Sequence, residues 1–127
     1  IHTMSQGGTV ILDTSAILHM RDLRPLMNMG NLVTTNYVIN ELKDVRAVIV
    51  PEILNISVYE ISKDEIELVR RNYHIPRLLS DTDVSLIVLA LRLRDKNPLV
   101  ITDDTMLIKF LKRLGIRYSV VFLRKRQ

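Results

Sequence analysis

Short apolar runs alternate along this chain with longer stretches of helical periodicity. The apolar runs lie at residues 10–12, 32–34, 56–61, 99–102 and 118–123. Short runs without a regular polar alternation are typical of strands that are buried on both faces of a sheet. The pattern therefore predicts five strands, separated by segments that are long enough to hold helices.

The clearest helix start follows the third run. Ser62 and Glu65 have the spacing of a capping box, and Ile61 and Ile66 are placed to form the hydrophobic staple around it. A second helix start is predicted after residues 32–34, where Asn36 is a suitable N-cap. Both signals mark the change from a strand to a helix.

Two later segments carry apolar stripes at helical spacing. The first helix is predicted over residues 80–94, and the second ends at Gly115. The stripe residues are Val84, Ile87, Val88 and Leu91 in the first helix, and Leu107, Phe110, Leu111 and Leu114 in the second.

Because strands and helices alternate throughout, the sequence predicts an α/β fold with three α/β/α layers around a mostly parallel sheet. No linker or repeat divides the chain, so residues 4–127 are expected to form one domain. Residues 1–3 precede Met4 and are expected to be a cloning remnant.

The composition limits the chemistry. The 127 residues are 47% hydrophobic and 25% charged, and they include no cysteine. This excludes a disulfide scaffold, a cysteine-bound zinc or iron–sulfur site, and a cysteine nucleophile. The formal charge of +4 suits a polyanionic partner. No apolar run is long enough for a membrane span and no secretion signal is visible, so we expect a cytoplasmic protein with no membrane partner.

Several carboxylates are expected where α/β folds bind their ligands. Ligands bind outside the carboxyl ends of the strands; Asp13 follows the first strand, and Asp103 and Asp104 follow the fourth. Glu41 and Asp83 share helical faces with apolar residues. An inward-facing carboxylate is costly to bury unless it is paired or bound to a metal. These acids are therefore candidates for one shared site.

Each acid also has an ordinary structural interpretation. The alternatives are a helix cap for Asp13, an ion pair with Arg46 for Glu41, a capping box with Ser80 for Asp83, a solvated turn for Asp103 and a helix cap for Asp104. Taken together, clustered carboxylates repel one another, and a divalent cation relieves that repulsion. An all-oxygen ligand set favours Mg²⁺ or Mn²⁺. In a basic protein such a site fits phosphodiester hydrolysis.

The same acids lie in four segments that resemble the motifs of the PIN-domain ribonucleases. Val10-Ile11-Leu12-Asp13-Thr14-Ser15-Ala16 resembles the first motif, and Val38-Ile39-Asn40-Glu41-Leu42 resembles the second. Leu79-Ser80-Asp81-Thr82-Asp83 resembles the third, and Val100-Ile101-Thr102-Asp103-Asp104 resembles the fourth. The four segments follow the order of the family and span nearly the whole chain.

The resemblance implies a metal-dependent endoribonuclease that cleaves single-stranded RNA. The residues that match its catalytic acids are Asp13, Glu41, Asp83 and Asp104. The expected ligands of Mg²⁺ or Mn²⁺ are Asp13, Asp83 and Asp104, with Asp103 as a neighbour that could exchange roles with Asp104. The supporting hydroxyl positions are Thr14, Ser15, Ser80 and Thr102. Asp81 is a weaker candidate than Asp83, because it lies two residues round the helix and points elsewhere.

The branch of the family is open between several readings. The motifs look most like the archaeal and eukaryotic endonuclease that matures the 3′ end of small-subunit ribosomal RNA, which implies pre-rRNA as the substrate. That branch usually carries a zinc ribbon, which is absent here. The alternatives are a VapC-type toxin held by an antitoxin, and a catalytically silent RNA-binding module. PIN relatives often dimerise, so a homodimer is also considered.

Basic residues near the end of the sequence are candidate RNA contacts. They are Lys109, Lys112, Arg113, Arg124, Lys125 and Arg126. If they contact phosphates, RNA binding should depend strongly on salt. The alternative is a solvated helix face followed by a frayed tail.

Overall fold

The computed structural model describes residues 8–19, 28, 30–42 and 55–120. The elements in chain order are β1 (Thr9–Leu12), α1 (Thr14–His19), β2 (Asn31–Thr35), α3 (Asn36–Leu42), β3 (Ser57–Tyr59), α5 (Lys63–Tyr73), α6 (Asp81–Arg92), the 3₁₀ helix η2 (Arg94–Lys96), β4 (Pro98–Ile101), α7 (Thr105–Arg113) and β5 (Arg117–Ser119). Strands and helices alternate, as the apolar pattern predicts. Within these described ranges no helix combines the length and apolarity that crossing a bilayer requires.

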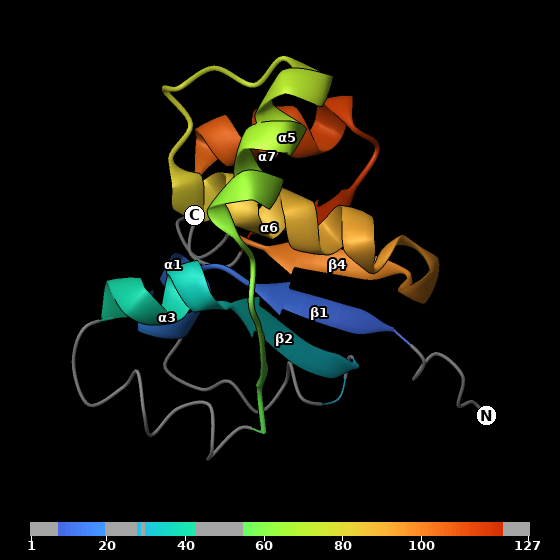
Figure 1. Ribbon diagram of the computed structural model, residues 1–127. Helices are drawn as coiled ribbons and strands as arrows, with labels where there is room; N and C mark the ends of the chain where they lie inside the picture. The colour runs from blue at the N-terminus through green and yellow to red at the C-terminus, as the bar shows by residue number, and fades with distance from the viewer. Residues whose placement is uncertain (1–7, 20–27, 29, 43–54, 121–127) are drawn as a thin grey trace.

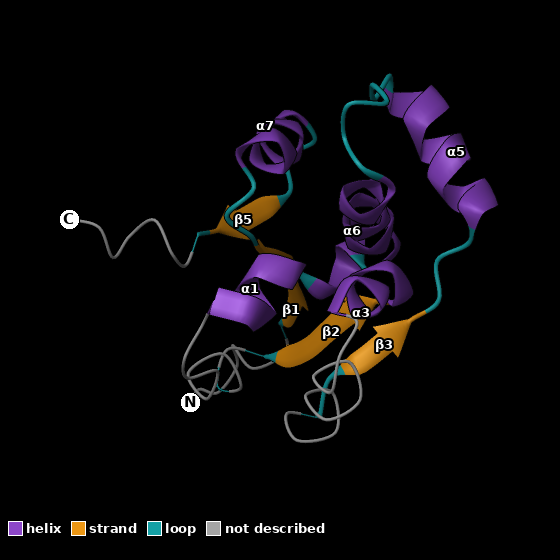
Figure 2. Cartoon of the chain, turned by 90° about the vertical axis from the view of Figure 1, so that its left-hand side faces the viewer, coloured by secondary structure: helices purple, strands orange, loops and turns teal. Residues whose placement is uncertain are grey.

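The five strands form one sheet in the order β3-β2-β1-β4-β5, and every neighbouring pair is parallel. Helices cover both faces: α5, α6 and α7 lie on one side of the sheet and α1 lies on the other (Figure 2). The predicted α/β architecture with a parallel sheet is confirmed. Leu12 of β1 is in register with Ile101 of β4, so the carboxyl ends of these two central strands lie side by side.

Two strands differ in length from the prediction. The third strand, predicted over residues 56–61, is reduced to Ser57–Tyr59, and Ile56 and Ile61 are buried on either side of it. The fifth begins at Arg117, one residue earlier than predicted, and is described to Ser119. Residues 121–123 of the predicted strand lie outside the described residues. Burial on both faces, which the apolar pattern predicts, is not found in these two edge strands, where Val58 is exposed and Tyr118 is only half-buried.

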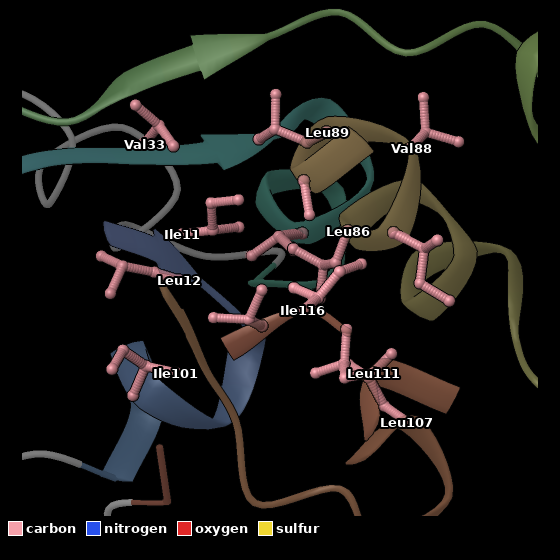
Figure 3. Packing of buried hydrophobic residues seen from close by; sticks show 14 of the residues in the cluster. Ile11, Leu12, Val33, Leu86, Val88, Leu89, Ile101, Leu107, Leu111 and Ile116 are labelled. Atoms are coloured by element: carbon pink, nitrogen blue, oxygen red, sulfur yellow. The ribbon is translucent and has the colours of Figure 1, made fainter. Parts of the chain in front are cut away.

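Helix α6 is the centre of the core. Every residue from Thr82 to Ala90 is buried, because the helix packs on three strands of the sheet and against α3 and α5. Figure 3 shows Leu86 and Leu89 of this helix among side chains of β1, β2 and α7. Three of the four predicted stripe residues, Val84, Ile87 and Val88, are buried and Leu91 is half-buried, so the burial extends round more of the helix than one stripe. The helix also ends at Arg92, before η2, rather than at residue 94.

The local signals at helix ends are mostly confirmed. Ser62 Oγ accepts from the N–H of Glu65 at 3.1 Å, and Glu65 Oε1 accepts from the N–H of Ser62 at 2.9 Å, which completes the capping box of α5. Both residues of the staple, Ile61 and Ile66, are buried. Gly115 follows α7 with a φ of 73°, in the left-handed region that glycine adopts without steric cost.

The predicted cap at Asn36 is wrong. The N–H of Val38 donates instead to Thr35 Oγ1 at 3.2 Å, so Thr35 caps α3. The Asn36 amide is used elsewhere: its Nδ2 donates to the carbonyl of Ile61 at 3.2 Å, and its Oδ1 accepts from the N–H of Ile61 at 2.9 Å. Asn36 thus joins the end of β2 to the segment after β3, where regular pairing has stopped.

A buried arginine fixes the segment that leads into α6. The Arg70 guanidinium donates to the carbonyls of Pro76 and Leu79, each at 2.8 Å, and to Asp81 Oδ1 at 2.7 Å. Because all three acceptors lie between α5 and the first residue of α6, Arg70 sets where α6 begins. The first turn of α6 carries one of the predicted site acids, Asp83.

Candidate active site

The acid that follows β1 is positioned by the sheet. The N–H of Asp13 donates to the carbonyl of Ile101 at 3.1 Å, which extends the β1–β4 pairing by one residue. The side chain is buried; Oδ1 accepts from the N–H of Thr14 at 2.6 Å and Oδ2 accepts from Thr102 Oγ1 at 2.5 Å. A helix cap would bond the second or third helical N–H rather than the first, so a simple cap does not account for Asp13.

The electrostatic environment of Asp13 makes its charged form less favourable than in water. Burial raises the pKa of this carboxyl above its usual range, and the hydrogen bonds from Thr102 and Thr14 offset only part of the shift. The negative charges of Asp104 and Glu41 raise the pKa further. The charges of two other predicted site acids therefore act on the Asp13 carboxyl.

Thr102 connects the acids that follow β1 and β4. Its Oγ1 donates to Asp13 and accepts from the N–H of Asp104 at 3.0 Å. Asp104 is the N-cap of α7, where its Oδ1 accepts from the N–H groups of Met106 at 2.9 Å and Leu107 at 3.2 Å. The helix-cap interpretation is correct for Asp104. The cap uses Oδ1 only, and the Asp104 carboxyl is also hydrogen-bonded to the side chain of Asp83.

Asp83 lies in the first turn of α6, where its N–H donates to the N-cap Ser80 at 3.1 Å. Its side chain is buried, with 8% of the residue exposed, and is hydrogen-bonded to Asp104. Burial, that hydrogen bond and the charges of Asp104, Asp13 and Glu41 raise the pKa of Asp83 to about 8. Such a shift identifies a carboxyl that lacks a compensating positive charge.

Glu41 differs from its prediction. It is exposed rather than turned inward, because α3 buries only two residues, Val38 and Leu42. Its oxygens accept one hydroxyl each: Oε1 from Thr14 Oγ1 and Oε2 from Thr82 Oγ1, both at 2.8 Å. The alternative partner, Arg46, lies outside the described residues. Glu41 thus reaches the acid cluster across the ends of α1 and α6.

The structure brings together the four acids that the sequence predicts to be catalytic: Asp13, Glu41, Asp83 and Asp104. In the described ranges, no group of three or more His, Asp or Glu side chains is arranged to hold a metal ion. The acids are instead bonded to hydroxyls, to backbone N–H groups and, for one pair, to each other.

The neighbouring acid Asp103 and the hydroxyl of Ser15 lie at the same edge of the sheet. The N–H of Asp103 donates to Ser15 Oγ at 3.3 Å, which ties the turn after β4 to the start of α1. The Asp103 side chain is half-buried. Its exchange of roles with Asp104 stays a prediction, as does any contact of Ser15 with a metal.

Asp81 is committed to a different task. Its carboxylate is bonded to Lys63 and to Arg70, each at 2.7 Å, and these two cations lower its pKa below the usual range. Asp81 therefore fixes the start of α6, while Asp83 carries the carboxyl of the acid cluster. This arrangement agrees with the helical-face argument that favours Asp83.

The basic residues of α7 divide into two kinds. Lys109 and Lys112 are exposed. Arg113 donates to the carbonyl of Tyr73 and lies over the ring of Phe110, with its guanidinium carbon 4.8 Å from the ring centre. Arg113 therefore ties α7 to α5. The remaining candidates lie outside the described residues: Arg124, Lys125 and Arg126.

Sequence reasoning missed two residues that shape the site. Thr82 holds Glu41, but a hydroxyl between two acids belongs to no recognisable pattern. Arg70 was detectable: it stands four residues after Ile66, on the apolar face of α5, and both residues are buried. A basic residue on a buried helical face indicates a structural ion pair.

Comparison with known proteins gives independent information on the fold. No protein-family model matches the chain, and no curated protein matches it. The chain is similar to a chain of the 2.2 Å resolution structure of VapBC-1 from nontypeable Haemophilus influenzae, with a TM-score of 0.55 and 17% identity. The match covers 88% of this chain and 97% of that one. At this identity the similarity establishes the shared α/β/α fold.

Proposed function

We propose that this chain is a metal-dependent endoribonuclease of the PIN type. The observation that carries the proposal is the cluster of Asp13, Glu41, Asp83 and Asp104, in which burial and mutual repulsion raise the pKa of Asp13 and Asp83. The cluster lies at the carboxyl ends of β1 and β4, the edge where parallel α/β folds bind ligands. A cation at this edge would offset the repulsion.

The chemistry of the acid cluster fits Mg²⁺ or Mn²⁺. All the candidate ligands are carboxylate oxygens, which these hard cations prefer. Asp13, Asp83 and Asp104 would hold the cation, directly or through water, with Asp103 as a neighbour able to take part. When bound, the cation would supply an activated water and neutralise charge on the phosphate.

The residues of the chain provide orientation. Thr102 and the N–H of Thr14 fix the Asp13 carboxylate, and the cap of α7 fixes Asp104. Glu41 is exposed and would orient an attacking water and accept its proton. In-line attack of that water on phosphorus breaks the bond to O3′, which takes a proton from solvent. The products are a 5′-phosphate and a 3′-hydroxyl.

The proposed substrate is single-stranded RNA. The fold similarity to VapBC-1 covers nearly all of that chain, and it supports a VapC-type ribonuclease with an antitoxin partner at least as well as a ribosomal enzyme. We therefore put the toxin-type ribonuclease first. Maturation of small-subunit pre-rRNA depends on the motif resemblance alone. A cytoplasmic location and a homodimer belong to the same proposal.

Cleavage of a labelled single-stranded RNA tests the function. The wild type is incubated with Mn²⁺ and with Mn²⁺ plus excess EDTA, and an Asp83→Asn variant is incubated with Mn²⁺. We expect cleavage only by the wild type with free Mn²⁺, and products that end in a 5′-phosphate. Equal cleavage in EDTA, or by the folded variant, would refute the proposal. RNA binding without cleavage by the Mn²⁺-loaded wild type would favour the silent module.

A further inference from the structure

Glu41 is held by two hydroxyls from two different helices. Thr14 of α1 donates to Oε1 and Thr82 of α6 donates to Oε2, each at 2.8 Å. Glu41 is exposed near the end of α3, and a glutamate side chain has several rotatable bonds that water leaves free. The two hydrogen bonds select one orientation of the carboxylate, where α1, α3 and the start of α6 lie together (Figure 1).

Thr82 can orient Glu41 because it is itself held firmly. It is buried, and its carbonyl accepts from Ser85 Oγ at 2.6 Å. Ser85 is fully buried and is hydrogen-bonded to Thr35 Oγ1 at 2.9 Å, and Thr35 caps α3 through the N–H of Val38. Helices α3 and α6 are thus joined through hydroxyls at the start of α3 and again near its end, at Glu41.

The chemistry of these partners also suits a cation site. Thr14 and Thr82 are neutral donors, so they orient the Glu41 carboxylate without cancelling its charge. Each oxygen of the Glu41 carboxylate has two acceptor positions. One position accepts from a threonine hydroxyl, and the other can bind a water or a cation. A lysine or arginine in the place of Thr82 would orient the same carboxylate but would compete with a bound metal.

We propose that Thr82 is a positioning residue: its hydroxyl, with that of Thr14, keeps the Glu41 carboxylate beside Asp13 and Asp83, where it completes a divalent-cation site. The inference rests on the proposed function for the cleavage step, whereas its effect on cation binding is measured without RNA. A purely structural role would need only the shape of the side chain, which valine reproduces.

Three variants separate these roles. Thr82→Val removes the hydroxyl and keeps the shape, and Thr82→Ser keeps the hydroxyl. Thr34→Val is the matched control, because it makes the same substitution at a buried threonine whose hydroxyl donates to the carbonyl of Leu12 and is bonded to neither Glu41 nor Thr82. Thr82→Ala replaces the valine variant if that variant does not fold. For each protein we measure Mn²⁺ affinity by calorimetry, single-turnover RNA cleavage and the melting temperature.

We expect Thr82→Val to weaken Mn²⁺ binding about 10-fold, the lower end of the range for residues that orient metal-site groups. Thr82→Ser should keep the wild-type affinity, and Thr34→Val should lower the melting temperature alone. In a Glu41→Gln background, Thr82→Val should have little further effect on Mn²⁺ affinity, because both changes remove the same interaction.

Two results would overturn the inference. The first is wild-type Mn²⁺ affinity in folded Thr82→Val. The second is an equal loss of affinity in Thr82→Val and Thr34→Val. If Thr82→Val weakens Mn²⁺ binding but even the wild type cleaves no RNA, the positioning role stands and the ribonuclease proposal fails. If the wild type binds no Mn²⁺, both fail.

Discussion

Replacing Asp83 by asparagine should stabilise the metal-free protein and abolish cleavage at the same time. The Asp83 carboxyl is buried, is hydrogen-bonded to Asp104 and has a pKa raised to about 8, chiefly by burial and next by its neighbouring acids. Asparagine has nearly the same shape and is neutral at every pH. Its amide can donate to Asp104, as the protonated Asp83 carboxyl does.

The size of the effect depends on pH. In the unfolded chain Asp83 titrates at its ordinary pKa of 3.8, and in the folded chain at about 8. Below pH 3.8 both states hold the proton, so titration adds no cost. As the pH rises towards 8 only the unfolded state releases its proton, so the free energy of unfolding falls by about 1.4 kcal/mol per pH unit. At pH 7 this cost is about 4 kcal/mol, and above pH 8 it is constant.

Urea unfolding in EDTA at several pH values between 5 and 8 measures this cost. The wild type should lose stability as the pH rises, and Asp83→Asn should have a smaller slope, which reflects Asp13 with its own raised pKa. Asp81→Asn is the matched control in the same helical turn. Lys63 and Arg70 lower the pKa of Asp81, so its contribution is present above pH 3.8 and is lost as the pH falls. This variant should therefore be less stable than the wild type and should still cleave RNA.

Manganese provides the complementary measurement. A ligand at 100 times its dissociation constant stabilises a folded protein by about 2.7 kcal/mol, so Mn²⁺ should stabilise the wild type and have much less effect on Asp83→Asn. If Asp83→Asn is less stable than the wild type at pH 8 in EDTA, the carboxyl is not under repulsion. A cation at this edge of the sheet would then have no electrostatic repulsion to relieve.

Three features outside the acid cluster give further predictions. Arg70→Met should lower the free energy of unfolding in urea by about 3 kcal/mol, because it leaves buried acceptors without a partner. If the loss is no larger than that of Arg71→Met, which replaces an exposed arginine, this prediction is wrong. Replacing both Lys109 and Lys112 by glutamine should reduce the slope of log affinity for single-stranded RNA against log salt by about 1.4, measured by fluorescence anisotropy; an unchanged slope would exclude these lysines as phosphate contacts. Gly115→Ala should lower the free energy of unfolding in urea by about 1 kcal/mol, because the φ of this residue is 73°. The added methyl would meet no atom, so the backbone conformation is the cause. A neutral effect would mean that the turn relaxes.

The parts of the fold that the sequence predicts correctly depend on neighbours in the chain. The capping box at Ser62 and the helix stop at Gly115 involve residues at most five positions apart, so local spacing reveals them. Asn36 was assigned to a local cap, yet its amide bonds Ile61, 25 residues away, while Thr35 caps the helix. An asparagine can either cap a helix or bond a distant backbone group, and the sequence alone does not show which it does before the sheet is assembled.

The same distinction applies to the candidate site. Asp13 and Asp104 were predictable because both follow strands, and parallel strands bring their carboxyl ends to one edge. The orientation of Glu41 was not predictable, because its two hydrogen-bond partners lie 27 and 41 residues away on other helices. The breadth of burial on α6 was also missed, since a helix that is apolar on nearly all sides has only weak periodicity.

Caps and site acids turn out to be compatible uses of the same residues. Oδ1 of Asp104 accepts hydrogen bonds from the N–H groups at the start of α7. These bonds fix the orientation of the whole carboxylate, Oδ2 included. In α6 the two tasks are divided: Ser80 accepts from the first turn, so the Asp83 carboxyl is released from capping. Each oxygen of Asp13 accepts a single hydrogen bond in the structure and has a second acceptor position. Whether an acid can serve a cation therefore depends on the acceptor positions that remain after its local hydrogen bonds are made, because a cap that rigidifies a carboxylate also prepares it to bind.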